Sequence, residues 1–210
     1  MRTGHKRFIK GVTLLAATVA VVYAFSSGPP PGRTGGFGDT TCQDCHQFGA
    51  DPSGSLTING VPDPYTPGQD YPITVTLGMP GQQRWGFQLA ARFQGDGSQT
   101  AGSQAGLITV TDPDNTQIKT VVNGCDPTMD PTCVQFIEHT STGTYLGTMD
   151  GPVSWTFTWT APSDPTSGTV EFDAAGNAAN GDGTPLGDYI YTTSATSGAP
   201  SMGPKAAPRR

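Results

Sequence analysis

The sequence predicts an all-β protein built as an antiparallel β-sandwich, and three observations support this prediction. Hydrophobic residues alternate with polar ones in short runs, the pattern of strands with one buried face. Turn-forming residues separate the runs, with 29 Gly and 19 Pro in the chain. Downstream of the N-terminus no segment longer than a turn or two has helical periodicity, so about 140 residues remain for a single β core.

The predicted strands follow one another at intervals typical of a sandwich. Their inward faces carry large apolar residues, as in the run Trp155, Phe157 and Trp159, which alternates with Ser and Thr. The sandwich domain is predicted over residues 56–194. The expected strands are Leu56–Ile58, Tyr71–Leu77, Trp85–Ala91, Leu107–Thr111, Thr116–Val122, Val134–His139, Trp155–Trp159, Val170–Ala174 and Tyr189–Thr192.

Both ends of the chain differ from this domain. Residues 1–25 combine a basic start with an apolar run of about 15 residues, which indicates a secretory signal peptide or, if uncleaved, an N-terminal anchor. Fifteen residues is short for a spanning helix, which needs about 20. Residues 26–55 are a Pro- and Gly-rich lead-in with no periodicity. Residues 195–210 are predicted to be a disordered tail.

Charge narrows the classes of partner. The N-terminal segment holds four Lys and Arg and no acid, so its removal moves the net charge from −6 to −10. An acidic chain lacks the cations that neutralise phosphates, which argues against nucleic acid. Export predicts an extracytoplasmic location: periplasmic, cell-surface or secreted. An uncleaved N-terminal segment would be the chain's contact with a membrane.

The lead-in contains the most informative motif, Cys42-Gln43-Asp44-Cys45-His46. This is C-x-x-C-H, the attachment signature of c-type haem. Two thiols at this spacing can each join one vinyl group of a porphyrin, and the next histidine is placed as the proximal iron ligand. Two other interpretations compete, a redox or structural cysteine pair and half of a zinc site. Export favours one covalent haem c, because its attachment takes place outside the cytoplasm.

Two further cysteines, Cys125 and Cys133, flank a turn-rich loop of Asp, Pro and Thr. In an oxidising compartment they are expected to form a disulfide, with two buried free thiols as the alternative.

The ligand opposite His46 would decide what the iron does. His139 is the favoured candidate, because it is the one histidine of the exported chain outside the motif. Met149 is the second candidate, and the third is an open coordination position. The stretch Gly176–Thr184 could be a calcium loop, but its spacing favours a turn held by Asn and Asp.

These motifs also resemble a known family, the bacterial reelin-like or choice-of-anchor V domain proteins. The resemblance extends over about residues 29–194. It implies an immunoglobulin-type, reelin-like sandwich displayed outside the cell, and the family's frequent C-terminal anchoring signal is not evident here. It is carried by Pro30–Gly35 before the C-x-x-C-H motif, Tyr65–Gly68, Trp85–Leu89, Trp155–Pro162, and above all Phe172–Gly183 with Gly187–Thr192.

Taken together, these features predict an exported monohaem c-type cytochrome that carries single electrons and is not primarily an enzyme. Its partner would be a redox protein or an extracellular electron acceptor, and the sequence is compatible with a homo-oligomer. The alternatives are a haem enzyme or sensor with an open sixth position, and a reelin-like surface or adhesion module without haem.

Overall fold

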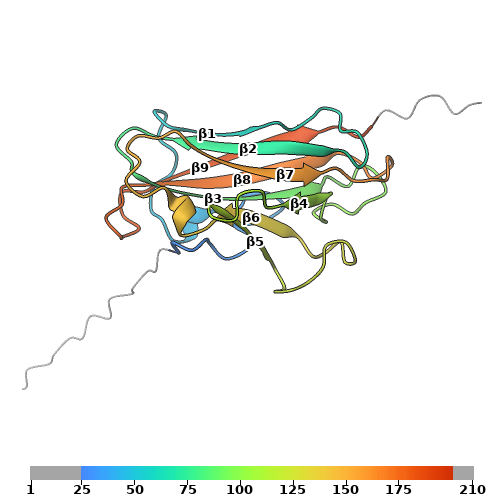
Figure 1. The fold of residues 1–210 in the computed structure, drawn as a ribbon, viewed down its shortest axis with the longest axis horizontal. Coiled ribbons are helices and arrows are strands. Elements are labelled where there is room, and N and C mark those ends of the chain that lie inside the picture. Colours follow the sequence, from blue (N-terminus) through green and yellow to red (C-terminus); the bar gives the residue numbers. More distant parts are fainter. Residues whose placement is uncertain (1–24, 201–210) are drawn as a thin grey trace, which may run out of the picture.

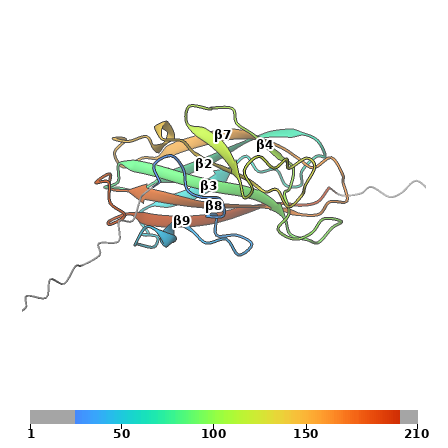
Figure 2. The same cartoon turned by 90° about the horizontal axis from the view of Figure 1, so that it is seen from below.

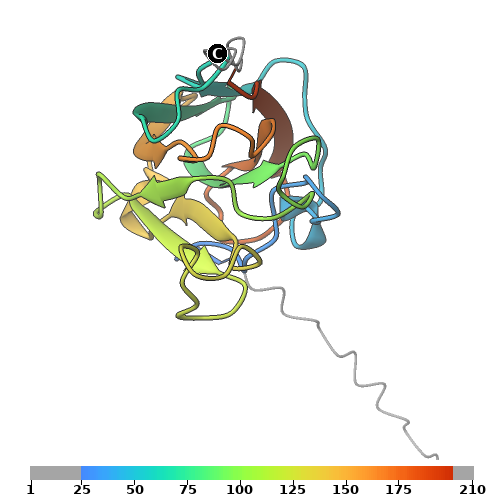
Figure 3. The ribbon, with the colours of Figure 1, turned by 90° about the vertical axis from the view of Figure 1, so that its right-hand side faces the viewer.

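The computed structural model describes residues 25–200 and contains two antiparallel sheets that face each other (Figures 1 and 3). One sheet has the order β1-β2-β7-β4 and the other β5-β6-β3-β8-β9. The predicted all-β sandwich is therefore confirmed. The strands are β1 (Ser55–Asn59), β2 (Asp70–Gly78), β3 (Arg84–Phe93), β4 (Leu107–Thr109), β5 (Thr116–Thr120), β6 (Gln135–His139), β7 (Val153–Thr160), β8 (Val170–Ala179) and β9 (Tyr189–Ser197).

The core lies between the sheets and is rich in aromatic residues. Along β7 every second residue is buried, so Trp155, Phe157 and Trp159 all face inward, as the alternation predicts. Phe87 of β3 stacks on Trp155 with ring centroids 4.5 Å apart, and Trp159 meets Phe172 of β8 edge-on at 4.9 Å. These contacts join the two sheets and bury most of the large apolar surface.

Two features go beyond the sequence prediction. The strands on either side of the turn after Asp112 lie in different sheets: β4 pairs with β7 in one sheet and β5 with β6 in the other. The chain therefore crosses between the sheets there. Strand β9 continues to Ser197, which pairs with Val170, so the sandwich extends three residues past its expected end. The predicted signal peptide up to residue 24, and the tail from residue 201, lie outside the described residues.

The lead-in is packed against the protein and is not the free linker that its composition suggested. It runs over the outer face of the five-stranded sheet, near β3 and β8 (Figure 2). That face carries buried polar side chains, which need hydrogen-bond partners. Arg92 of β3 donates to the Thr34 hydroxyl, the Gly36 carbonyl and the Asp39 carboxylate, at 2.8, 3.0 and 2.9 Å. The lead-in thereby places the C-x-x-C-H motif at one end of the sandwich.

Within residues 25–200, no helix is long and apolar enough to cross a membrane.

Candidate functional site

The C-x-x-C-H motif forms a short turn at one end of the sandwich. The 3-10 turn η1 (Cys42–Asp44) is capped by Thr41, whose hydroxyl accepts from the Gln43 amide at 3.2 Å. The amides of Cys45 and His46 both donate to the Cys42 carbonyl, at 3.2 and 3.0 Å. This single turn brings both thiols and the imidazole to the same side of the chain. Both thiols are free and partly exposed.

His46 is held by the end of the sheet opposite the motif. Its Nδ1 lies 2.6 Å from Oδ2 of Asp188, a carboxylate that is 1% exposed. The Asn180 amide donates to the other oxygen of Asp188 at 3.2 Å. The amide nitrogen of Asn177 is 3.2 Å from both ring nitrogens of His46.

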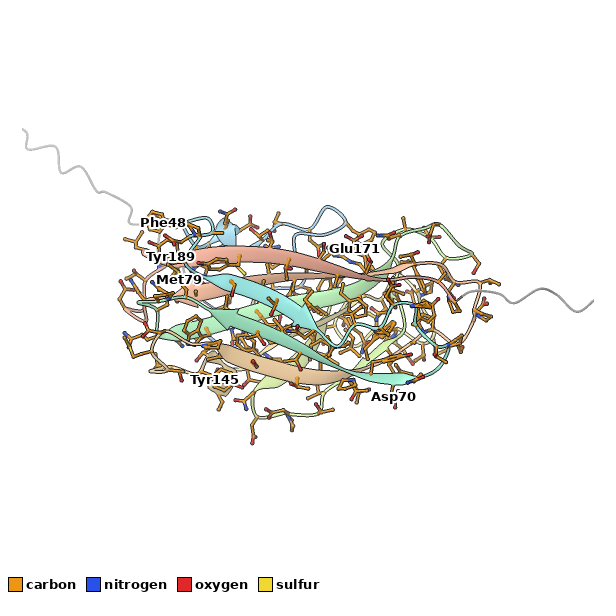
Figure 4. All side chains as sticks on the ribbon, turned by 90° about the horizontal axis from the view of Figure 1, so that it is seen from above. Phe48, Asp70, Met79, Tyr145, Glu171 and Tyr189 are labelled. Carbon is orange, nitrogen blue, oxygen red and sulfur yellow. A yellow bond between two sulfur atoms is a disulfide. The ribbon has the colours of Figure 1, made fainter. Side chains whose placement is uncertain are left out.

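Main-chain contacts fix the segment that follows His46 against the start of β9. The Phe48 amide donates to the Asp188 carbonyl, and the Ile190 amide donates to the Phe48 carbonyl, at 3.3 and 3.1 Å. Phe48 also packs on Tyr189 with ring centroids 5.8 Å apart, a pair that is labelled in Figure 4. The motif is thus joined to the start of β9 by side chains and by backbone.

His139 occupies the last position of β6, where β6 separates from β3. The pairing of these strands ends at Gln88 with Glu138, and the ring of His139 then takes the place of backbone pairing. Its Nδ1 lies 3.1 Å from the amide nitrogen and 3.2 Å from the carbonyl oxygen of Phe87. A Cβ on Gly86 would come within 2.7 Å of the ring, so glycine is required for this close approach.

The predicted site residues meet in one pocket of about 760 Å³, its open mouth included. Cys42, Cys45, His46 and His139 all line it, although 93 positions of sequence separate His46 from His139. The remaining walls combine aromatic, small and polar residues: Phe25, Ser26, Pro29, Pro30, Arg33, Thr41, Arg84, Trp85, Gly86, Phe87, Thr144, Asn177, Ala179, Gly181, Gly183, Thr184 and Asp188. In Figure 1 the turns and loops that bear them gather at the left-hand end.

Burial controls the protonation of the groups in and beside this pocket. Burial lowers the pKa of His139 to about 4, despite the opposing effect of its hydrogen bond to Phe87. The imidazole is therefore neutral at pH 7, the form that can ligate a metal. Burial likewise raises the pKa of Cys42 to about 12, so its sulfur is a neutral thiol.

Three other expectations concern Met149, the pair Cys125 and Cys133, and the stretch Gly176–Thr184. Met149 is 57% exposed and is not among the lining residues, so the structure does not bring it to His46. Cys125 and Cys133 form the predicted disulfide. Their loop lies at the far end of β6 from His139, away from the pocket. Of the stretch Gly176–Thr184, residues 176–179 belong to β8, and the expected turn begins at Asn180. There Asn180 accepts from the Asp182 amide and Asp182 from the Thr184 amide, at 3.0 and 2.7 Å.

Sequence reasoning missed Asp188, Asn177 and Gly86. Each lies in a stretch that had been singled out for family resemblance or strand pattern, without a role at the site. The signal that could have found Asp188 is an acidic residue at the end of an Asn- and Gly-rich loop, just before a strand. Its contact with His46 crosses 142 positions of sequence, which no local pattern reveals.

Among residues 25–200, no three His, Cys, Asp or Glu side chains are grouped so as to hold a metal ion. A haem iron, by contrast, takes only one or two ligands from the protein.

Comparisons with known proteins show no family and only distant structural likenesses. No protein-family model matches the chain, and no curated protein is similar to it. Among solved structures, the reeler domain of human F-spondin is 20% identical, covers 72% of this chain and 93% of its own, and has a TM-score of 0.41. AvmM, which catalyses macrocyclization in alchivemycin A biosynthesis, is 14% identical, with coverage of 75% and 94% and a TM-score of 0.42. The major pilin SpaD of Corynebacterium diphtheriae is 14% identical, with coverage of 68% and 35% and a TM-score of 0.41.

These are distant likenesses, and the fold assignment rests on the strand order of this chain itself.

Proposed function

We propose that this protein is an exported monohaem c-type cytochrome that transfers single electrons outside the cytoplasm. Cys42 and Cys45 would hold the haem through thioether bonds, His46 would be the proximal ligand, and His139 the distal ligand. The observation that carries the proposal is the common pocket. Two thiols and two histidines, singled out from sequence for one cofactor, line the same cavity.

The pocket fits such a group on several counts. The core residues Trp85 and Phe87 are among the residues that line it, and Gly86 leaves room for the ring of His139. The buried Oδ1 atom of Asn177 has no hydrogen-bond partner, so the protein alone leaves this side of the pocket incompletely satisfied.

The two histidines favour electron transfer over catalysis. A c-type haem, when bound, supplies a one-electron couple at its iron, and two imidazole ligands leave no position for a substrate. His139 is suited to this role because Phe87 holds its ring and because it is neutral at pH 7. The open mouth of the pocket would give a redox protein or an extracellular acceptor access to the site. The acidic chain would steer basic partners toward it.

Two alternatives lead to different outcomes in the same experiment. If His139 does not ligate, the site has an open position and suits a haem enzyme or sensor. If no haem is attached, the protein is a reelin-like surface or adhesion module. The sandwich architecture favours this last reading, because many cell-surface domains share it. Cys42 and Cys45 would then stay as the free thiols of the structure.

The proposal is tested by producing the full chain in a cell that exports it and attaches haem to C-x-x-C-H proteins. We expect an intact mass raised by one haem and a pyridine haemochrome spectrum typical of two thioether bonds. The double variant Cys42→Ala/Cys45→Ala should show neither. A wild-type chain that folds, is exported and carries no haem would contradict the proposal and support the surface module.

A further inference from the structure

We propose that Asp188 is a positioning residue for the proximal imidazole and that its negative charge lowers the reduction potential of the site. This inference rests on the proposed function and adds a regulatory residue that the C-x-x-C-H motif does not contain. Three observations support it: the short contact with His46, the burial of the carboxylate, and the way its second oxygen is fixed.

The contact assigns the two ring nitrogens of His46 different roles. A carboxylate oxygen accepts hydrogen bonds, so in the 2.6 Å contact with Oδ2 of Asp188 the Nδ1 atom of His46 is the donor and carries the proton. The lone pair then lies on Nε2, the nitrogen left free to bind iron. The side-chain amide nitrogen of Asn177 lies 3.2 Å from both ring nitrogens, so the assignment rests on the shorter contact with Asp188.

Asp188 is held firmly enough to impose this orientation. Its Oδ1 accepts from the Asn180 amide at 3.2 Å, and its backbone carbonyl accepts from the Phe48 amide at 3.3 Å. The side chain of Asp188 is 2% exposed and that of His46 is 12% exposed. Neither partner can turn into solvent without breaking these contacts.

The imidazole of His46 is the group that pairs with the Asp188 carboxylate. Within residues 25–200, no Lys or Arg forms an ion pair with this carboxylate, and His46 is its one ion-pair partner. A buried carboxylate behind a metal-binding histidine makes the ring a stronger donor. A stronger donor stabilises the more positive, oxidised iron over the reduced iron, which lowers the reduction potential.

The test is a redox titration of the haem-loaded protein at fixed pH, comparing wild type with Asp188→Asn. The asparagine oxygen can still accept from Nδ1, so the variant removes charge while keeping the hydrogen bond. In Asp188→Asn we expect the ratio of reduced to oxidised iron at a given applied potential to rise at least tenfold. This corresponds to a reduction potential higher by about 59 mV for one electron. Asp182→Asn is the matched control, since it removes the same charge from an exposed position of the same loop, and it should leave the potential unchanged. Equal potentials in the two variants would overturn the inference.

A second measurement is independent of haem attachment and of how the variant folds. Nitrogen-15 NMR of the wild-type chain without haem should show His46 protonated at Nδ1, and a proton on Nε2 would overturn the inference. The haemochrome spectrum reports separately on the proposed function. A chain without haem but with the Nδ1 tautomer would contradict the cytochrome proposal while leaving the Asp188–His46 pairing in place.

Discussion

At the scale of single residues, burial shifts the pKa values of two neighbouring residues of β6 in opposite directions. Burial lowers the pKa of His139 to about 4. Burial raises the pKa of Glu138 to about 7, although hydrogen bonds from Lys119 and Gln88 act against this. The directions differ because burial disfavours the charged form, which is the protonated form of histidine and the deprotonated form of glutamate.

These two groups should have opposing effects on stability against pH in the haem-free chain. Between pH 6.5 and about 4 the unfolded chain protonates His139 and the folded chain does not, so the free energy of unfolding falls as pH falls. Between pH 7 and 4.5 the folded chain protonates Glu138 first, so the free energy of unfolding rises as pH falls. Each contribution is on the order of 3 kcal/mol at most, so the pair nearly cancels.

Two single variants should separate these contributions. His139→Gln removes the group that destabilises the folded chain at low pH, so its free energy of unfolding relative to wild type should rise as pH falls from 6.5 to 4. Glu138→Gln removes the group that stabilises the folded chain at low pH, so its free energy of unfolding relative to wild type should fall as pH falls from 7 to 4.5. Urea unfolding at several pH values measures both. Parallel profiles for the two variants would contradict these pKa directions.

A second prediction at the scale of single residues concerns a substitution at Gly86. A methyl group there would press on the ring of His139, so Gly86→Ala should displace the ring. In the haem-loaded protein we expect partial loss of the low-spin spectrum and new binding of carbon monoxide. Gly78→Ala is the control, because Gly78 also lies in a strand, β2, but outside the pocket wall, and its Cβ would approach only Pro152, at 3.2 Å. An unchanged spectrum in Gly86→Ala would mean that His139 does not depend on this contact.

At the scale of elements, the sequence predicted the features that depend on nearby residues and missed those that depend on residues far apart in the chain. Strand β7 and the pair Cys125–Cys133 were predictable, since alternation and loop length are local properties. The separation of β4 and β5 into different sheets was not, because both flank a turn that also suits a hairpin. The lead-in was misjudged because its order comes from Arg92, a residue far away in sequence that needs buried partners. Asp188 was missed for the same reason.

The disulfide loop is the element whose role is most easily separated from the site. Joining Cys125 to Cys133 closes a short loop, which is worth about 2–3 kcal/mol through the entropy of the unfolded chain. Cys125→Ala/Cys133→Ala should therefore lower the free energy of unfolding by about that amount. Because the loop is not part of the pocket wall, the haem spectrum should stay the same. A changed spectrum would show that the loop does help to position His139.

At the scale of the whole molecule, the sandwich acts as a frame that brings distant segments to one end. The lead-in brings Cys42, Cys45 and His46 across the outer face of the five-stranded sheet. Strand β6 ends at His139, and β9 begins beside Asp188. The sheet order places β6, β3, β8 and β9 side by side, which explains how their ends share a single pocket.

The most direct test of this account is the electron paramagnetic resonance spectrum of the oxidised, haem-loaded protein, recorded for wild type and for His139→Ala. The central claim, that one haem lies between His46 and His139, predicts a low-spin ferric signal in wild type and a high-spin signal in the variant. A high-spin wild-type signal, or a low-spin signal that His139→Ala leaves unaltered, would contradict it.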